Sequence, residues 1–226
     1  MAKSKVMKRH ITPQKVLLFA VGLAIIYLPS YIHRVMDVLD VQIGPVGPPS
    51  VILWNWLAVA LLLGLVLYIE RKRLSSISIK RPQGKDIEWA FWFWGIGATA
   101  SWLAYTLLPP GESYGTNSLL EYSLPILAGI IITAAITEEI FFRGYMIERL
   151  GELTGTLWLA AAVSFVVFVA PHLTFFGPEW LLYHGVGTIL LYVLYVWRRN
   201  LIACMVLHLL GNLPFIFVAL GVLPRP

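Results

Sequence analysis

Two adjacent carboxylates, Glu138 and Glu139, follow an uncharged apolar stretch, where an ionisable side chain is costly. A charge at the centre of a bilayer costs at least about 2.5–3.5 kcal/mol on insertion scales, so such residues usually have a function. Glu139 and Arg143 are four residues apart and share a helix face, so they can form an ion pair. Glu138 points about 100° away from that face. We interpret Glu138 as a candidate general base; the alternative is a structural ion pair with a spare glutamate.

Three more polar residues, His172, His208 and Asn212, interrupt the apolar segments that follow. Pro171 lacks a backbone donor and can kink the helix just before His172. His208 and Asn212 are four residues apart, so the amide can orient the imidazole or stabilise an oxyanion. The alternative for each is a hydrogen bond between membrane helices. For His184, which lies beside glycines without a polar partner at helical spacing, helix packing is the better interpretation.

The composition indicates a chain that lies mostly in lipid. Only 13% of the 226 residues are charged, about half the usual share of a soluble domain, and 58% are hydrophobic. These values exclude a soluble enzyme and a disordered tail, and a single cysteine, Cys204, excludes an internal disulfide. Long apolar runs without period-two alternation predict an all-α helical bundle and not a barrel. We predict about seven transmembrane spans, at residues 16–35, 51–69, 87–108, 125–147, 156–175, 180–197 and 200–222.

Two turns decide whether the polar residues meet. Glu138 and His172 share a level of the bundle only if the chain turns near residue 155, and the residues there favour a turn. His208 lies about 13 Å from a predicted turn at residues 198–200, whereas Glu138 lies about 25 Å from its own. The fourth and fifth predicted helices then extend about 12 Å further at that end. The depth of the site in the membrane stays open, with a preference for the cytoplasmic half.

The basic residues predict the orientation. Lys and Arg gather on the cytoplasmic side of membrane proteins, and an N-in, C-out arrangement places all but Arg34 and Arg225 of the 17 basic residues there. Topology therefore explains the net charge of +5, and no nucleic-acid partner is needed. We divide the chain into an N-terminal part, 1–124, with three spans and a basic cytoplasmic loop, and a four-helix catalytic core, 125–226. Residues 70–86 either lie along the inner membrane surface or form a solvated loop.

The polar residues also occur in a familiar order. They resemble the three motifs of the CPBP intramembrane proteases, the CAAX prenyl endopeptidase and bacteriocin-processing (Abi) family. The resemblance covers about residues 120–215, whereas the first three spans match only as generic membrane helices. The three matching segments are Glu138-Glu139-x-x-x-Arg143, Phe168-x-x-x-His172 and His208-x-x-x-Asn212.

This resemblance implies a helical bundle with a polar cavity and assigns a role to each motif residue. Glu138 would activate a water as general base, with Glu139 and Arg143 in support. His172 and His208 would complete the site, and Asn212 would help to hold the oxyanion.

The cofactor requirement stays open between two mechanisms. The family is commonly described as metalloprotease, although a metal-free glutamate mechanism is also argued for it. Zinc is possible, with Glu138, His172 and His208 as candidate ligands. The chain lacks an HExxH motif. Because Asn212 is a poor zinc ligand and a good oxyanion donor, we favour the metal-free version.

The predicted function is hydrolysis of peptide bonds in membrane-associated or lipid-modified substrates by a Glu-activated water. The alternatives are a transporter or proton relay that uses the same Glu/His cluster, and a peptide-binding immunity protein that does not cut. The expected partners are the lipid bilayer and a membrane protein or peptide. We expect a multi-pass integral protein, in a prokaryotic plasma membrane; the cleavage motif and the oligomeric state stay open.

Overall fold

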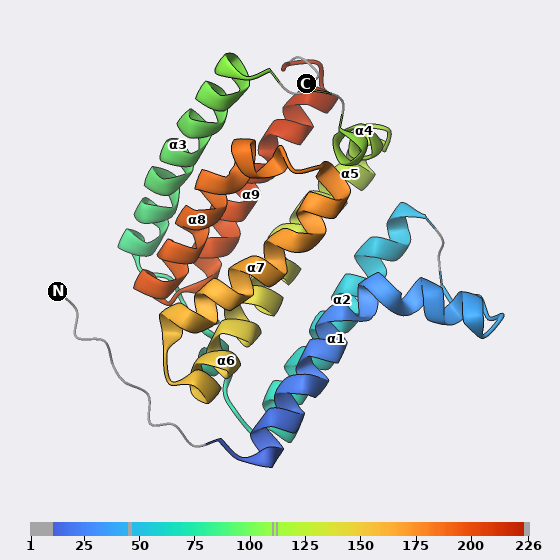
Figure 1. The fold of residues 1–226 in the computed structure, drawn as a ribbon, viewed down its shortest axis with the longest axis vertical. Helices are drawn as coiled ribbons and strands as arrows, with labels where there is room; N and C mark the ends of the chain where they lie inside the picture. The colour runs from blue at the N-terminus through green and yellow to red at the C-terminus, as the bar shows by residue number, and fades with distance from the viewer. Residues whose placement is uncertain (1–10, 45–46, 110, 112, 224–226) are drawn as a thin grey trace.

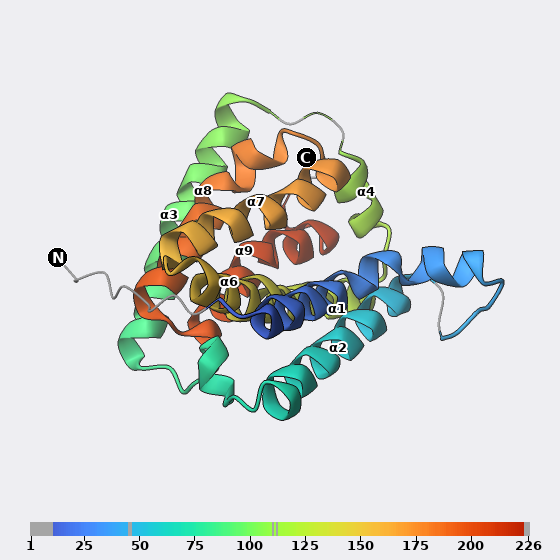
Figure 2. The same cartoon turned by 60° about the horizontal axis from the view of Figure 1, so that its bottom comes forward.

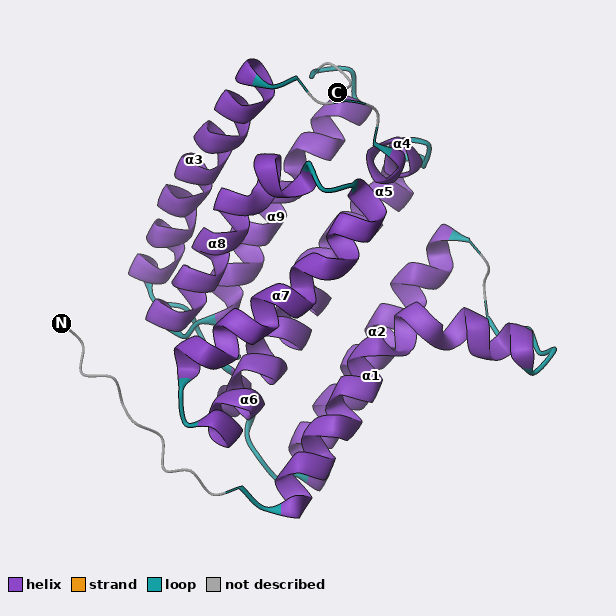
Figure 3. Ribbon diagram, in the orientation of Figure 1, coloured by secondary structure: helices purple, strands orange, loops and turns teal. Residues whose placement is uncertain are grey.

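The computed structural model describes residues 11–44, 47–109, 111 and 113–223, and all regular secondary structure in these residues is helical (Figure 3). The predicted all-α class is therefore confirmed. In addition to α-helices, the chain forms two π-helices, η1 and η3, and one 3₁₀-helix, η2. The segments are α1 (Pro13–Val38), α2 (Pro48–Gly64), η1 (Leu65–Ile69), η2 (Leu74–Ile77), α3 (Gly84–Leu107), α4 (Tyr114–Leu120), α5 (Leu124–Glu138), η3 (Glu139–Met146), α6 (Ile147–Thr154), α7 (Leu157–Phe176), α8 (Trp180–Arg198) and α9 (Leu201–Ala219).

The long helices alternate in direction and form one bundle (Figure 1). Helices α5, η3 and α6 join end to end as one rod, which packs against α9 on one side and α2 on another. Helix α3 packs mainly on α8 and α9, and α1 and α2 form a hairpin along one side (Figure 2). The chain is an integral, multi-pass membrane protein, because most of these helices are long and apolar.

The number of spans differs from the prediction of about seven. Within the described residues, six helical segments are long and apolar enough to cross a membrane. The remaining predicted span, 87–108, is α3, which has 24 residues and is therefore long enough at about 36 Å. Its hydropathy falls below that of the six because tryptophan, glycine, serine and threonine replace aliphatic residues there. Helix α3 is therefore outside the six by hydropathy and not by length, and it runs the length of the bundle beside α8 (Figure 1).

Both predicted turns are present, and left-handed backbone forms each of them. Helix α6 ends at Thr154, and Gly155 follows with φ 75°. Helix α8 ends at Arg198, and Arg199 adopts φ 51° before the Asn200 side chain caps α9 by accepting a hydrogen bond from the Ala203 N–H at 3.1 Å. Helix α6 extends beyond the α8–α9 turn, as expected (Figure 1). The turns therefore bring the three motif helices side by side at the predicted levels.

The basic loops converge on one end of the bundle. The start of α1, which contains Lys15, the 70–86 segment and the α8–α9 turn lie at that end (Figure 1). The predicted cytoplasmic residues Lys3, Lys5, Lys8 and Arg9 lie outside the described residues. The 70–86 segment is docked against the helical core and is not a loose loop. Ile77 is fully buried, and the Ser78 carbonyl accepts a hydrogen bond from the Leu201 N–H at 3.1 Å. This segment therefore closes the end of the helical core.

Candidate active site

The first motif lies at the junction of α5 and the π-helix η3. Glu138 is the last residue of α5, and Glu139 and Arg143 belong to η3. π-helical turns occur often at functional sites, since they change the helix face that a residue occupies. The Glu139 and Arg143 side chains are fully buried, whereas the Glu138 side chain is 25% exposed. The two glutamates therefore occupy different environments, although they are neighbours in sequence.

Glu139 connects two of the three motifs. One carboxylate oxygen, Oε1, lies 3.0 Å from Arg143 Nη1, so the ion pair expected from the sequence is present. The same oxygen lies 2.7 Å from His208 Nδ1 on α9. An Nδ1–H donating to this carboxylate fixes the orientation of the imidazole and directs Nε2 away from Glu139. Glu139 therefore holds His208 in place through a contact between helices.

Arg143 lies between two aromatic rings. Its guanidinium carbon is 4.1 Å from the centre of the Phe168 ring and 4.2 Å from the centre of the Tyr192 ring. Cation–π contacts of this kind reach about 2 kcal/mol when they are desolvated. The Ser164 hydroxyl donates to the Phe142 carbonyl at 2.8 Å and lies 3.2 Å from the Tyr192 hydroxyl. α7 and α8 therefore clamp the arginine from both sides.

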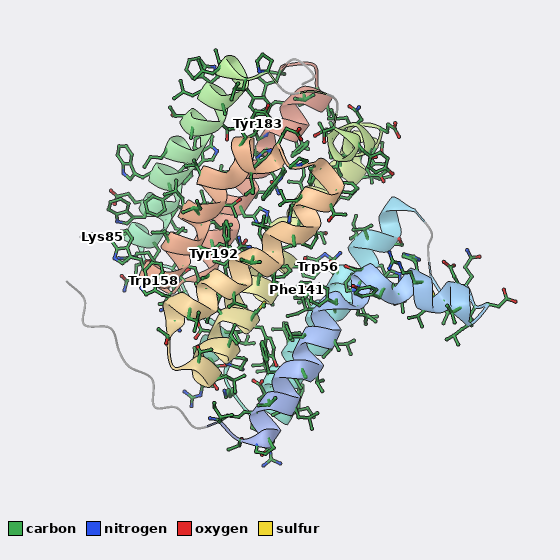
Figure 4. All side chains as sticks on the ribbon, in the orientation of Figure 1. Trp56, Lys85, Phe141, Trp158, Tyr183 and Tyr192 are labelled. Carbon is green, nitrogen blue, oxygen red and sulfur yellow. The ribbon has the colours of Figure 1, made fainter. Side chains whose placement is uncertain are left out.

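Sequence reasoning missed Tyr192. It lies in the middle of the bundle, on α8, which carries none of the motif residues (Figure 4). Phe168 at least belongs to a motif segment, whereas Tyr192 has no charged, His or Asn neighbour at helical spacing that would distinguish it. Only the rotation of α8 against η3 reveals its contact with Arg143.

Glu138 faces the other side of the same imidazole. Its Oε2 lies 3.8 Å from His208 Nε2, and this oxygen is buried without a hydrogen-bond partner among the described residues. Sequence spacing gave Glu138 no partner, but the fold supplies His208. A separation of 3.8 Å is too long for a direct hydrogen bond and suits a bridging water. His208 therefore lies between two carboxylates with different roles.

His172 approaches this group from α7. Its Nδ1 lies 2.8 Å from the Phe168 carbonyl oxygen, one turn earlier, so an Nδ1–H donor leaves Nε2 without a proton. Its ring packs against Phe168 and Trp180, with centroids 4.4 and 4.6 Å away. Glu138 and His208 are close enough to interact with it electrostatically. His172 is therefore near the glutamate but not hydrogen-bonded to it.

Asn212 is the motif residue that the structure connects least. It lies one turn beyond His208 on α9 and is partly exposed, and its side chain makes no hydrogen bond within the described residues. The structure thus joins Glu138, Glu139, Arg143 and His208 by short distances and places His172 beside them. His184, expected to pack, lies with its ring centre 5.6 Å from that of Trp180.

Buried polar atoms without partners concentrate at this site. Among the described residues, such atoms occur in Thr137, Glu138, Glu139 and Arg143, and otherwise only in Trp54. Arg143 contributes all three guanidinium nitrogens, because the short Nη1–Oε1 distance lacks hydrogen-bond geometry. Unsatisfied buried groups are rare in proteins and require an explanation. Their hydrogen-bonding capacity is available to a water or to a substrate.

The three candidate zinc ligands do not converge. Within the described chain, no three His, Cys, Asp or Glu side chains are arranged to hold a metal ion. His208 Nε2 faces Glu138, but the His172 ring is packed between aromatic side chains. The donors as arranged therefore do not fit a three-ligand zinc site.

Comparison with known proteins identifies the same part of the chain. The sequence model of the family described as Rce1-like, type II CAAX prenyl endopeptidase, matches residues 120–214. No curated protein and no solved structure matches the chain. The matched segment begins at the end of α4 and ends within α9, so it includes all six motif residues. The resemblance inferred from the motifs is therefore confirmed over this segment.

Proposed function

We propose that this chain is an intramembrane endopeptidase that cleaves membrane-associated or lipid-modified substrates with a water activated by Glu138. The family match over residues 120–214 supports a peptide hydrolase. The single observation that carries the proposal is the pairing of two unlike carboxylates across one imidazole. Glu139 is buried and paired, whereas Glu138 is partly exposed, and its Oε2 lies 3.8 Å from His208 Nε2. This asymmetry supplies one positioning group and one proton acceptor.

The reaction starts with a water held between Glu138 Oε2 and His208 Nε2. Glu138 takes one proton, and the hydroxide oxygen forms a bond with the carbonyl carbon of the scissile peptide. When the tetrahedral intermediate collapses, the C–N bond breaks. The proton passes from Glu138 to the leaving amine nitrogen, directly or through His172. The products are one carboxylate and one amine, and the glutamate returns to its ionised form.

The oxyanion needs donors on the opposite side of the water. We assign this role to Asn212 and to His208 in its charged form, with Nδ1–H donating to Glu139 and Nε2–H to the oxyanion. Glu139 stabilises the charged imidazole, because its fully buried carboxylate lies 2.7 Å from His208 Nδ1, where little solvent screens the interaction. Arg143 balances the negative charge of Glu139, with Nη1 3.0 Å from Oε1.

We propose a mechanism that uses no metal. The side chains available for ligation do not converge, and the mechanism above assigns each of them another role. The measurement is turnover by the purified, chelator-washed protein with and without added Zn²⁺. Retained turnover without metal supports the proposal, and turnover that appears only after zinc is restored overturns it.

The test of the activity is the Glu138→Gln variant, with Glu121→Gln as the matched control. Glu121 is an exposed residue just after α4 and lies within the same family match. The probe is a prenylated peptide that ends in a CAAX sequence, presented in vesicles, with the new carboxyl terminus detected by mass spectrometry. We expect Glu138→Gln to lower the rate by about 10²–10⁴-fold and the control to leave it unchanged.

A second readout separates the activity from the choice of substrate. Peptide termini are compared in membranes that contain the unaltered protein or Glu138→Gln. New termini that depend on Glu138 support a protease even if the CAAX peptide is not cut. Full turnover by Glu138→Gln, or the absence of any dependent terminus, refutes the assignment.

A further inference from the structure

A cleft at the basic end of the bundle lies apart from the candidate active site. Helix α1, η1 and α6 form it, and no motif residue contributes to its walls. Leu18, Ile69 and Leu153 supply the apolar part of the lining. Ile69 is 62% exposed, so the apolar wall is continuous with the outer surface of the bundle. The cleft therefore opens toward the outer surface of the bundle, which faces lipid in a membrane protein.

The floor of the cleft is a buried ion pair. Arg149 and Glu70 are 5% and 4% exposed, and Arg149 Nη2 lies 2.6 Å from Glu70 Oε2. Arg149 Nε donates to both oxygens of Glu70, at 3.0 and 2.8 Å. Its Nη1 donates to the Ser76 carbonyl and to Glu152, so every guanidinium donor group is engaged. The donor groups of Arg149 are therefore already hydrogen-bonded within the protein and are not free to bind a ligand.

The hydrogen-bonding capacity that remains in the cleft belongs to donors. Both oxygens of Glu152 accept hydrogen bonds from Lys72 Nζ at 2.7 Å. Both oxygens of Glu70 accept hydrogen bonds from Arg149. Lys72 retains a third N–H, because an ammonium group has three donors. Lys15 carries a full ammonium group that contacts no carboxylate in the part of the chain that the structure describes. The Lys15 ammonium and the third N–H of Lys72 are therefore the cationic donors that the cleft offers to a ligand, beside the neutral amide of Gln14 and two carboxylates that are already paired.

The backbone adds to this field. Lys15 lies in the first turn of the 26-residue helix α1, whose N-cap is Thr12, and the N-terminal end of a helix carries partial positive charge. The distribution of Lys and Arg places this end of the bundle on the cytoplasmic side, where anionic phospholipids give the membrane surface a negative potential. A positive cleft with an apolar wall at this level matches the phosphate and the upper acyl chain of a phospholipid.

We propose that the cleft between α1, η1 and α6 binds the phosphate of an anionic phospholipid, with Lys15 and Lys72 as the contacting cations. The lipid chain lies along Leu18, Ile69 and Leu153. The buried Arg149–Glu70 pair forms the base of the site and does not contact the phosphate. The bound lipid ties the start of α1 to the end of α6. This site is independent of the proposed protease activity.

The test uses the full chain and native mass spectrometry. The protein is exchanged from detergent containing equal amounts of phosphatidylglycerol and phosphatidylcholine, and the lipids that remain bound are counted. We expect phosphatidylglycerol to be retained preferentially. Lys15→Gln should lower that retention about fivefold, since one lysine near an anionic membrane surface contributes about that much. Lys15→Glu should lower it further, with phosphatidylcholine unchanged.

Lys85→Gln is the matched control, because Lys85 is an exposed lysine at the same end of the bundle and outside the cleft (Figure 4). Equal losses in Lys15→Gln and Lys85→Gln would mean a diffuse basic surface and would overturn the site. Equal retention of both lipids would do the same. Inorganic phosphate and glycerol phosphate form the third arm: if either one displaces the lipid completely at millimolar concentration, the ligand is a soluble phosphate and the lipid assignment fails.

Discussion

Glu139 and Glu148 are two buried carboxylates on the same continuous helical rod, and each is paired with an arginine, but their hydrogen bonding differs. At the basic end, Glu148 accepts from Tyr195, Ser78 and Arg199. At the candidate site, the carboxylate of Glu139 is buried like that of Glu148, yet one of its oxygens and all three guanidinium nitrogens of Arg143 have no hydrogen-bond partner among the described residues. Burial of the carboxylate alone therefore does not distinguish a structural ion pair from a catalytic one.

Completeness of hydrogen bonding does distinguish them. A buried polar network with all groups satisfied rigidifies a protein, whereas a partly satisfied one is costly to keep. The Glu148 group joins α6, the 70–86 segment and α8, so it fixes the end of the bundle. In the Glu139 group, several buried polar atoms beside Glu138 have no hydrogen-bond partner among the described residues, so they could bond to the reacting water. Substitutions in the two groups should therefore have opposite effects, on activity at Glu138 and on stability at Glu148.

The largest effect is expected from Glu138→Gln. Its rate should fall by about 10²–10⁴-fold because the proton acceptor is lost. The thermal midpoint should stay within a few degrees of that of the unaltered protein, since Oε2 has no partner to lose. Turnover and thermal unfolding of the same preparation are the measurements. A large loss of stability together with the loss of rate would mean that Glu138 is a structural residue.

The opposite pattern is expected for Glu148→Gln. Arg199 is 34% exposed, so water can solvate its charge once Glu148 is neutral, and the cost falls mainly on the fully buried Tyr195 hydroxyl. A buried hydrogen-bonding group that loses its charged partner typically costs about 1–3 kcal/mol. The free energy of unfolding should fall by that amount, because Arg199 and Tyr195 lose their charged partner. The rate per folded molecule should remain near that of the unaltered protein. The distinction between the two groups fails if activity is lost while stability is retained.

A smaller effect on rate is expected from Tyr192→Leu. Without the ring, Arg143 loses one of its two cation–π contacts, worth about 2 kcal/mol in a desolvated site, or roughly 30-fold in rate. Tyr192→Phe keeps the ring and should restore most of the rate, although it loses the contact with Ser164. A positioning role predicts that kcat falls and KM changes little. Equal losses in both variants would assign the effect to the hydroxyl.

The smallest effect concerns Asp86, in the first turn of α3. Burial raises its pKa, but hydrogen bonds from the Gln83 N–H and from Arg198, together with the charges of Arg198 and Lys80, outweigh it and hold the pKa below its ordinary value. A lowered folded pKa means that the contribution to stability is complete above about pH 4 and is lost as the pH falls through the folded value. Unfolding measured between pH 6 and 3 should show this loss, and Asp86→Asn should reduce it.

The sequence predicted features that depend on local chemistry. The turns at Gly155 and at Arg198–Asn200 follow from glycine, charge and capping residues, and the Glu139–Arg143 pair follows from helical spacing. Their levels along the bundle then followed from counting residues to each turn. These inferences need no knowledge of how the helices rotate.

Contacts between residues on different helices could not be predicted from the sequence. Spacing paired His208 with Asn212, whereas the structure pairs it with Glu139 and turns its other nitrogen toward Glu138. Spacing also gave no sign of Tyr192 against Arg143. Such contacts depend on the rotation of each helix about its axis, which an apolar sequence with little amphipathic pattern leaves undetermined. The docked 70–86 segment was missed for a related reason, since its anchors, Ile77 and Ser78, lie among basic and polar residues.

The π-helix from Glu139 to Met146 contains Glu139 and Arg143 of the site and leads directly into the anchored end of the same rod. A π-helical turn contains one residue more than an α-helical turn, so everything after it is rotated by about 100° relative to an unbroken helix. The two ends of the rod therefore present their side chains in different directions. Glu139 faces His208 on α9, and Glu148 faces Tyr195 on α8. Removing a single residue from this segment would leave the helix continuous, but the two ends could no longer both fit.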